Sequence, residues 1–370
     1  MGITSLNILA DYVINLTHYH KSEKMNNKLF LMALSVVFCI SCKQTNVNID
    51  AFNQVIEVST LDSIYSDEED ELGVITDIGI YDGILIAKHM HDEYNFSLID
   101  LASGKLLQRW GRKGNGSDEY LDFGSNFVIQ DSLLVFSERM KKKIHYVSIP
   151  NVLKNSDSVD VAQAFYPYTV DFRPTRFCFL DTYKLAVGSF KEGRFGVLDS
   201  NDSIMDFASG YPFGYEEIEG IYRGNVFQSD IKSNNKQRKF VISTFASDVF
   251  EIYQLSDNCV HRTFVSPYAN IPQIKQKGGR FTVDYDKSIA GLMKMAVSDD
   301  LICFTYSSLS YTEAAAMDMA SREILCFNWK GEKVKKYILP FPISNLSIDE
   351  HYIYVVRYQN DRTIVYRFSL

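Results

Sequence analysis

The most restrictive feature of this sequence is a strand-turn-strand unit that recurs along most of its length. The clearest copy lies within residues 96–123. Apolar and polar residues alternate up to Asp100, a turn through Gly104 follows, and a second strand runs from Leu106 to Trp110. Two strands joined by a short turn that contains glycine form a β-hairpin. Because weaker copies of this hairpin recur down the chain, we expect a repeated all-β architecture.

Six pairs of adjacent apolar segments can be read from the sequence. The pairs are 83–87 with 96–100, 133–136 with 144–147, 184–187 with 195–199, 239–243 with 249–253, 301–304 with 323–328, and 352–356 with 363–367. A spacing of roughly 50 residues between units is what a blade of four strands requires. The sequence therefore predicts an all-β chain folded as a six-bladed β-propeller.

The two ends of the repeat predict how the ring closes. The last unit reaches Leu370 without an outer strand, whereas the strand near Val55 has no partner at the other end. Joining the two would complete the sixth blade and remove two exposed sheet edges. We therefore expect an N-terminal strand, Gln54 to Val58, to pair within the last blade, which contains Tyr352 to Leu370.

The N-terminal region resembles a targeting segment. Residues 25–41 hold a short basic stretch and then a 12-residue apolar run, Leu29 to Ile40. Such a run is too short to span a bilayer and is typical of a secretory signal peptide. It ends at Ser41-Cys42, which resembles the bacterial lipobox, a motif whose cysteine is acylated. A buried N-terminal helix is the alternative.

The lipobox resemblance has further implications for how the chain is organised and where it resides. It implies that Met25 is the start, that residues 1–24 are upstream translation, and that residues 42–50 are a tether to a propeller spanning residues 51–370. Lys43 follows the cysteine where aspartate would imply inner-membrane retention. The resemblance therefore implies an outer-membrane or periplasmic protein, anchored in outer-membrane lipid through acylated Cys42.

Composition excludes one class of partner. A net charge of −8 and a pI near 5.5 lack the basic face that nucleic acid requires. We expect no cofactor. The one Cys-x-x-Cys spacing, Cys39 to Cys42, has no second pair and therefore argues against a zinc or thioredoxin-like site.

The glycine-rich segment that follows the clearest hairpin, residues 111–120 (GRKGNGSDEY), looks like the G-x-x-G-x-G-P-G-E-F/Y segment of NHL-like and TolB-like six-bladed propellers. Together with the lipobox, it resembles the TolB-like propeller lipoproteins common in Bacteroidetes, over about residues 50–370. The resemblance implies a binding or scaffold module and names no ligand. A phosphate-binding loop is the other interpretation of residues 111–116. Such a loop opens a helix, whereas the residues that follow here are acidic and lead back into a strand.

Candidate ligand-binding residues lie in two long connections, Tyr211 to Arg223 and Tyr268 to Tyr285. Loops of this length in a compact domain are usually functional or disordered. Aromatic and arginine side chains at a propeller mouth would suit a protein, peptide or glycan partner, although they could equally cap the ends of the blades. The candidates are Tyr211, Phe213, Tyr215, Tyr222, Arg223 and Arg280. Residues 307–321, with a short helical turn, are a third candidate surface.

Two other groups of residues could bind a metal. His89 and His91 would face the same side of a strand, as metal ligands do, but we favour an exposed hairpin loop over residues 88–95. The five adjacent carboxylates Asp67 to Glu71 predict a solvated loop rather than a calcium site. We therefore expect no metal site.

No catalytic residue is named either, because the G-x-S-x-G nucleophile elbow is absent from the sequence. Propellers nevertheless host both binding and catalysis. A hydrolase or lyase with its active site at the central channel is therefore the alternative to a binding module.

Cys303 and Cys326 fall in the two strands of the fifth pair, so we expect them on neighbouring strands of one blade. They could then face each other in an oxidising periplasm, where a disulfide needs Cα atoms within about 7 Å. The other strand cysteines, Cys178 and Cys259, are interpreted as small buried apolar side chains.

Overall fold

The structure is a computed structural model of the chain. The described residues are 48–370 except 68–71, 91, 117–118, 122–125, 139, 156–159, 166–167, 170, 200–203, 209, 212–217, 219, 257–258, 268–269 and 361. The predicted signal peptide, Cys42 and most of the predicted tether therefore lie outside the described residues.

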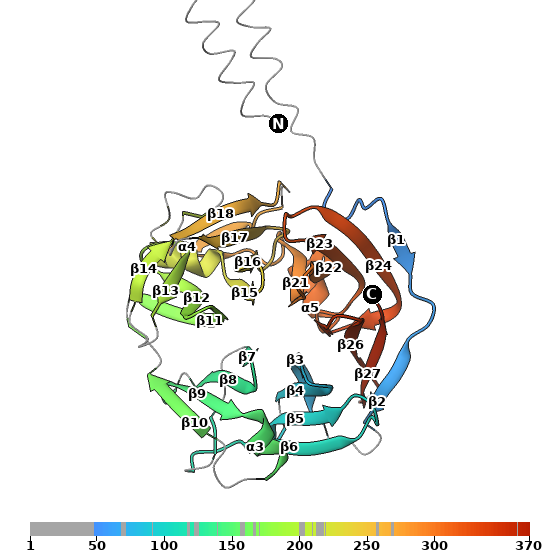
Figure 1. Cartoon of the computed structure of the whole chain (residues 1–370). Helices are drawn as coiled ribbons and strands as arrows, with labels where there is room; N and C mark the ends of the chain where they lie inside the picture. Colours follow the sequence, from blue (N-terminus) through green and yellow to red (C-terminus); the bar gives the residue numbers. More distant parts are fainter. Residues whose placement is uncertain are drawn as a thin grey trace, which may run out of the picture. The chain divides into compact units, whose positions relative to one another are not determined.

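Six antiparallel sheets form blades around a central channel (Figure 1). Blade 1 consists of β3 (Val74–Tyr81), β4 (Ile84–Met90), β5 (Tyr94–Asp100) and β6 (Leu106–Arg112). Blade 2 consists of β7 (Phe127–Gln130), β8 (Leu133–Glu138), β9 (Lys143–Ser148) and β10 (Asp160–Phe165). Blade 3 consists of β11 (Phe172–Leu180), β12 (Tyr183–Phe190), β13 (Phe195–Leu198) and β14 (Ile204–Ala208).

The remaining blades follow the same order, from the innermost strand outward. Blade 4 consists of β15 (Ser229–Asn234), β16 (Lys239–Thr244), β17 (Phe250–Ser256) and β18 (Cys259–Val265). Blade 5 contains β21 (Ile289–Val297), β22 (Leu301–Ser310), β23 (Ser321–Asn328) and β24 (Lys333–Ile343). Blade 6 contains β25 (Asn345–Ile348), β26 (Tyr352–Gln359), β27 (Arg362–Ser369) and β2 (Asp62–Ser66). The predicted six-bladed, all-β fold and its six strand pairs are confirmed.

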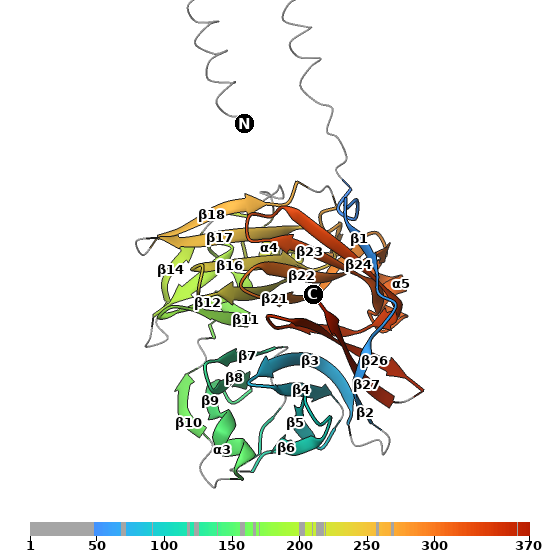
Figure 2. The same cartoon turned by 45° about the vertical axis from the view of Figure 1, so that its right-hand side comes forward.

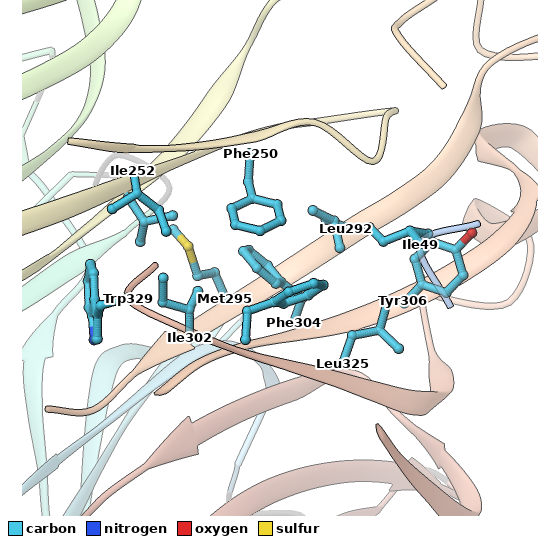
Figure 3. Packing of buried hydrophobic residues seen from close by; sticks show 12 residues of the cluster. Ile49, Phe250, Ile252, Leu292, Met295, Ile302, Phe304, Tyr306, Leu325 and Trp329 are labelled. Carbon is cyan, nitrogen blue, oxygen red and sulfur yellow. The ribbon is translucent and has the colours of Figure 1, made fainter. Parts of the chain in front are cut away.

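The middle strands explain why the repeat is visible in the sequence. Each sheet packs between two neighbouring blades, so a middle strand such as β4 is buried from Leu85 to His89 without a break. The apolar cores accordingly lie between blades. In one of them, Phe250 of blade 4 packs with Phe304 of blade 5, and Ile49 from the N-terminal segment completes the cluster (Figure 3).

The tight turns that link the strands use residues suited to a left-handed backbone. Asp82, Asp131 and Asp181 occupy equivalent turns of blades 1 to 3, with φ of 45°, 52° and 52°. A short polar side chain tolerates this conformation better than a branched one. Gly104, the predicted turn glycine, has a φ of 67°, and a Cβ there would lie 2.2 Å from the carbonyl oxygen of Ile64. Only glycine fits this position.

The strand order gives the propeller two unlike faces. Every innermost strand starts at what we call the loop face, where the connections between blades and the turns from second to third strands also lie. The opposite face carries the other turns and is called the turn face. The loop face holds α4 (Gly220–Val226), α5 (Tyr311–Ala315), and a hairpin of β19 (Ile274–Lys277) and β20 (Arg280–Val283). Helix α3 (Ile149–Leu153) lies at the turn face. None of the helices in the described ranges is long and apolar enough to cross a membrane.

The ring is closed by an N-terminal strand in the last blade, as predicted, but the strand is not the predicted one. β2 pairs antiparallel with β27, from Asp62 opposite Arg367 to Ser66 opposite Ile364. The prediction for residues 54–58 is wrong. They contain β1 (Val55–Glu57), which pairs in parallel with β24 as a fifth strand of blade 5 (Figure 2). The 11-residue β24 offers a long outer edge, whose backbone groups β1 satisfies.

The chain that precedes β1 is attached along the same edge. Lys333, the first residue of β24, donates hydrogen bonds from Nζ to the carbonyl oxygens of Asn48 and Ala51, at 2.6 and 3.0 Å. Ile49 is 1% exposed, and Phe52 packs against blade 5. Because β24 starts at the turn face, contact between the N-terminal segment and the propeller begins on that side.

Cys303 and Cys326 lie directly opposite each other on β22 and β23, which confirms the prediction of neighbouring strands. Both are buried free thiols, and their Sγ atoms are 2.8 Å apart. Opposite residues of an antiparallel pair have Cα atoms about 4.5–5.5 Å apart, which is within disulfide range. Formation of a bond in an oxidising compartment stays a prediction, which mass spectrometry of non-reduced peptides checks.

Candidate functional site

The two long connections selected from the sequence pack against each other on the loop face. Ile218 of the first, together with Val226 at the end of α4, shares a buried cluster with Val283 of the second. Tyr222 and Phe281 cover this cluster from either connection. The structure therefore brings the two predicted surfaces together.

The candidate residues of the first connection take part in this packing. The half-buried Tyr211 ring lies 5.3 Å from the guanidinium of Arg194 and 5.5 Å from that of Arg223, and burial raises the pKa of its hydroxyl. Arg223 donates a hydrogen bond to the carbonyl oxygen of Ile218 at 2.9 Å. Arg280, by contrast, is exposed at the tip of the β19–β20 hairpin. Phe213 and Tyr215 lie outside the described residues.

Arg194 is the centre of a buried network that joins blades 3 and 4. The residue is 1% exposed, and its Nε donates to Oε2 of Glu251 at 3.0 Å. Its other nitrogens donate to three acceptors, all at 2.8 Å: the Phe227 carbonyl oxygen, Ser229 Oγ and Thr244 Oγ1. Arg262 donates to the second carboxylate oxygen of Glu251 at 3.1 Å. Because all three guanidinium nitrogens donate within the protein, we interpret this network as structural.

The exposed loop predicted for residues 88–95 is wrong at several positions. Lys88, His89 and Asn95 are 6%, 2% and 1% exposed, because β4 continues to Met90. Burial lowers the pKa of His89 to about 4, so its ring is neutral near pH 7. His91 lies outside the described residues. Over the part of the chain that the structure describes, no group of three or more His, Cys, Asp or Glu residues could hold a metal ion.

Asp67, predicted to lie in a solvated loop, is 1% exposed. Its side chain accepts a hydrogen bond from the backbone N–H of Leu72 at 2.9 Å, and this bond draws the carboxylate into the turn before β3. The prediction is therefore wrong for Asp67. The other four carboxylates of the run, residues 68–71, lie outside the described residues.

Asp248 fastens the second connection to blade 4. It is 1% exposed and accepts hydrogen bonds from Nδ2 and the backbone N–H of Asn270, at 2.7 and 3.1 Å. Burial raises the pKa of this carboxyl from 3.8 to about 6, against the opposing effect of the hydrogen bonds. The folded protein therefore keeps a proton on Asp248 at pH values where the unfolded chain has released it.

This pKa predicts that the wild type loses stability as the pH rises from about 4 to about 6.5, since the folded state holds the extra proton. One pKa unit corresponds to about 1.4 kcal/mol, so the loss reaches at most about 3 kcal/mol. Asp248→Asn cannot titrate and should remove this part of the pH dependence. Urea unfolding of both proteins across this pH range measures it, and parallel stability curves would contradict the prediction.

A cavity of about 200 Å³ occupies the central channel and is lined by the innermost strands of all six blades. Most of the lining side chains are apolar, among them Ile78, Val128, Cys178, Met295 and Leu346. The polar lining side chains are Lys232, Ser233 and Ser347.

A tier of charged side chains lies at the loop-face end of this cavity. Asp77 on β3, Arg176 on β11, Asp230 on β15 and Lys294 on β21 each precede the cavity-lining residues of their own strand by one or two positions. Because the innermost strands all run away from the loop face, this tier lies between the cavity and that face.

Three of these four residues follow or form β-bulges. The pairing register shifts between Ile75 and Asp77 in β3, between Pro174 and Arg176 in β11, and between Leu292 and Met295 in β21. The innermost strands of blades 2, 4 and 6 pair with their neighbours without such a shift. A bulge adds one residue to a strand and redirects the side chains beside it, which is why bulges are common next to functional sites.

Threonine side chains stabilise all three bulges. Oγ1 of Thr76 and of Thr175 each donate to a carbonyl oxygen of the second strand, at 3.4 and 3.2 Å. Oγ1 of Thr305 accepts the backbone N–H of Lys294 at 3.0 Å. None of the four residues of the charged tier is among the candidates predicted from the sequence. The signal of this tier is a threonine followed by a charged residue directly before an apolar strand, as in Thr76-Asp77 and Thr175-Arg176.

Lys294 reaches across the mouth of the channel. It belongs to blade 5, yet its Nζ donates a hydrogen bond to the carbonyl oxygen of Thr76 in blade 1 at 2.8 Å. Burial lowers the pKa of the ammonium, and the charges of Arg176 and Lys232 lower it further, whereas Asp77 and Asp230 raise it.

Most of the exposed large apolar side chains lie on the loop face. Among the described residues, 12 large apolar side chains are exposed, and the following lie on the loop face: Val74, Met90, Met140, Tyr168, Tyr285, Leu309, Met317 and Tyr358. We call these residues the apolar rim. Tyrosine and methionine are among the residues enriched in protein interfaces.

Comparison with known proteins gives the chain a family. A protein from Bacteroides fragilis NCTC 9343, described as an exported protein, has a similar structure, with a TM-score of 0.55 and 12% identity over 85% of this chain and 99% of that chain. A member of the DUF4221 family from Bacteroides vulgatus ATCC 8482 gives a TM-score of 0.50 and 9% identity over 84% of this chain and 99% of that chain. At such identities the likeness concerns the fold alone. A comparison with curated proteins found no match. The family model of TolB-like six-bladed propellers matches residues 57–351, and the chain therefore belongs to that family.

Proposed function

We propose that this chain is an exported, lipid-anchored envelope protein whose propeller binds a protein, peptide or glycan partner at its loop face. The apolar rim is the observation that carries this proposal. Side chains such as Met140, Met317 and Tyr358 are 78%, 52% and 43% exposed on the loop face. Exposed apolar residues that gather on one face are typical of interaction surfaces.

The attachment of the N-terminal segment supports the same assignment. This segment meets the propeller at the turn-face end of β24, where Lys333 holds Asn48 and Ala51. Cys42 lies only six residues before Asn48 in the sequence. A lipid attached at Cys42 would therefore be joined to the propeller on the turn-face side, and the apolar rim would stay open to a partner.

The partner-binding proposal is tested with substitutions on opposite faces. Met317→Ser, alone and with Met140→Ser, removes part of the rim. Met205→Ser alters a methionine of similar exposure, 58%, that lies near the turn face. In quantitative pull-downs from envelope extract, we expect the rim variants to lose proteins that the wild type and Met205→Ser both retain. Equal capture by all four proteins would rule out the rim as the binding face.

Anchoring is tested at the cysteine itself. We expect Cys42→Ser to move the protein from the membrane fraction to the soluble fraction, because stable anchoring needs more than one acyl chain and all of them depend on this residue. Cys259 is exposed, so its interpretation as a buried side chain is wrong. Cys259→Ser is the matched control and should stay in the membrane fraction. A Cys42→Ser protein that sediments as firmly as the control would contradict lipidation.

A hydrolase or lyase with its site at the channel is the second candidate. It is favoured by the convergence of Asp77, Asp230 and Lys294 at one mouth, where burial lowers the pKa of the lysine. An enzyme would turn over a substrate found in the pull-down and would lose that activity in Lys294→Met. A binding module would retain the substrate unchanged.

A further inference from the structure

Two lysine ammonium groups at the channel have no counter-ion among the described residues. Across the described residues, no carboxylate lies within ion-pair distance of Nζ of Lys294 or of Lys232. The ammonium of Lys294 has three N–H donors, and its one hydrogen-bond acceptor among the described residues is the carbonyl oxygen of Thr76. Lys232 lines the cavity just beyond the charged tier.

The charges around the mouth do not balance. Arg176 is paired with Asp230 at 3.8 Å, and the two side chains are 16% and 14% exposed. With these two neutralising each other, Lys232 and Lys294 face the single carboxylate of Asp77, so the net charge is +1. These five side chains therefore carry a net positive charge in a chain whose net charge is −8.

The two ammonium groups also act on each other. The charge of Lys232 disfavours the charged form of Lys294, in addition to the effect of burial. A buried charge without a partner is unfavourable, and two like charges close together are more so. An anion held between the two lysines would relieve both effects and would satisfy the remaining donors.

The bulge at Lys294 gives this arrangement a structural basis. An ordinary strand would pair Met293 and Lys294 in register with β22, whereas the register shift between Leu292 and Met295 turns the lysine toward the channel. Thr305 Oγ1 accepts the backbone N–H that the bulge leaves without a ladder partner, at 3.0 Å. The lysine is thus directed across the mouth rather than into the interface between blades.

We propose that the loop-face end of the channel binds a small carboxylate with an apolar body. The carboxylate accepts hydrogen bonds from Lys294 and Lys232, and the apolar body lies in the cavity beside Ile78, Met295 and Leu346. A cavity of about 200 Å³ has room for roughly ten non-hydrogen atoms. This ligand enters the channel, so its binding is separate from the docking of a partner on the apolar rim.

Isothermal titration calorimetry on the full chain tests the proposal with three probes that differ in one feature each. Benzoate has the charge and the apolar body, benzyl alcohol has only the body, and acetate has only the charge. We expect benzoate to bind about tenfold or more tightly than either of the others, because each lacks one of the two interactions.

Matched variants locate the site. Lys294→Met should weaken benzoate binding by about tenfold or more, since a charge-assisted hydrogen bond is lost. Lys287→Met, which alters a loop-face lysine that is 76% exposed, should bind benzoate as the wild type does. Met140→Ser on the apolar rim should also bind it normally, even if partner capture is lost.

Three results would overturn the proposal: no benzoate binding by the wild type, equal binding of benzoate and benzyl alcohol, or unchanged binding by a folded Lys294→Met. Circular dichroism and thermal unfolding show whether that variant is folded. If it is not, Lys232→Met is used instead. The comparison of the three probes on the wild type tests the proposal without any variant.

Discussion

A chain that begins at Asp67 is expected to lose most of its stability, because it lacks β2, the strand that closes the ring. Its removal strips β27 of the pairing that runs from Asp62 opposite Arg367 to Ser66 opposite Ile364. The side chain of Tyr65, which is 8% exposed, leaves the core between blades 6 and 1 at the same time. The expected loss is several kcal/mol, from a total of about 5–15 kcal/mol for a typical domain. Urea unfolding followed by circular dichroism measures it.

A chain that begins at Thr60 is the matched control. It also lacks Cys42, β1 and the buried Ile49, but it retains β2. We expect it to be less stable than a chain that begins at Asn48, yet to unfold at a clearly higher urea concentration than the chain that begins at Asp67. Equal midpoints for the chains that begin at Thr60 and Asp67 would show that β2 does not close the ring in solution.

The sequence predicts closure by an N-terminal strand but points to the wrong strand, for a physical reason. Val55, Ile56 and Val58 form an apolar segment, whereas the true closing strand, residues 62–66, reads DSIYS. An outer strand buries only part of one face against its neighbours, so it needs few apolar side chains. Val55 is in fact 50% exposed. β1 pairs with the outer edge of blade 5 instead, where Ile56 and Val58 pack against the core between blades 5 and 6.

The blades are predictable and the charged tier is not, because the two depend on different information. Middle strands bury both faces, so their apolar runs are visible from the sequence alone. A bulge, in contrast, is a mismatch in register between two strands, which neither strand's sequence shows by itself. Lys294 follows Met293 within an apolar run, and nothing in that run indicates that a bulge occurs there. Aromatic and arginine residues limit the prediction of a binding site in another way. Such residues can line a binding face, but they can equally pack within the fold, as Tyr211 and Arg223 do.

Arg194→Met is expected to lower the free energy of unfolding by about 3–5 kcal/mol, because it leaves a buried carboxylate without its main partner. Glu251 is 0% exposed and would retain Arg262, whose side chain is 31% exposed. The hydroxyls of Ser229 and Thr244 would also lose the donor that both share. Urea unfolding of the variant and the wild type gives the difference.

Two further variants separate the effect of leaving the Glu251 carboxylate without Arg194 from the other effects of Arg194→Met. Arg238→Met breaks an ion pair with Asp181 whose side chains are 45% and 35% exposed, and should change stability by no more than about 1 kcal/mol. Adding Glu251→Gln to Arg194→Met should recover part of the loss, because the amide is neutral and can still bond to Arg262. If the double variant is no more stable than Arg194→Met, the loss comes from the packing and hydrogen bonds of the arginine. The network would then join blades 3 and 4 through packing and hydrogen bonds rather than through the attraction of opposite charges.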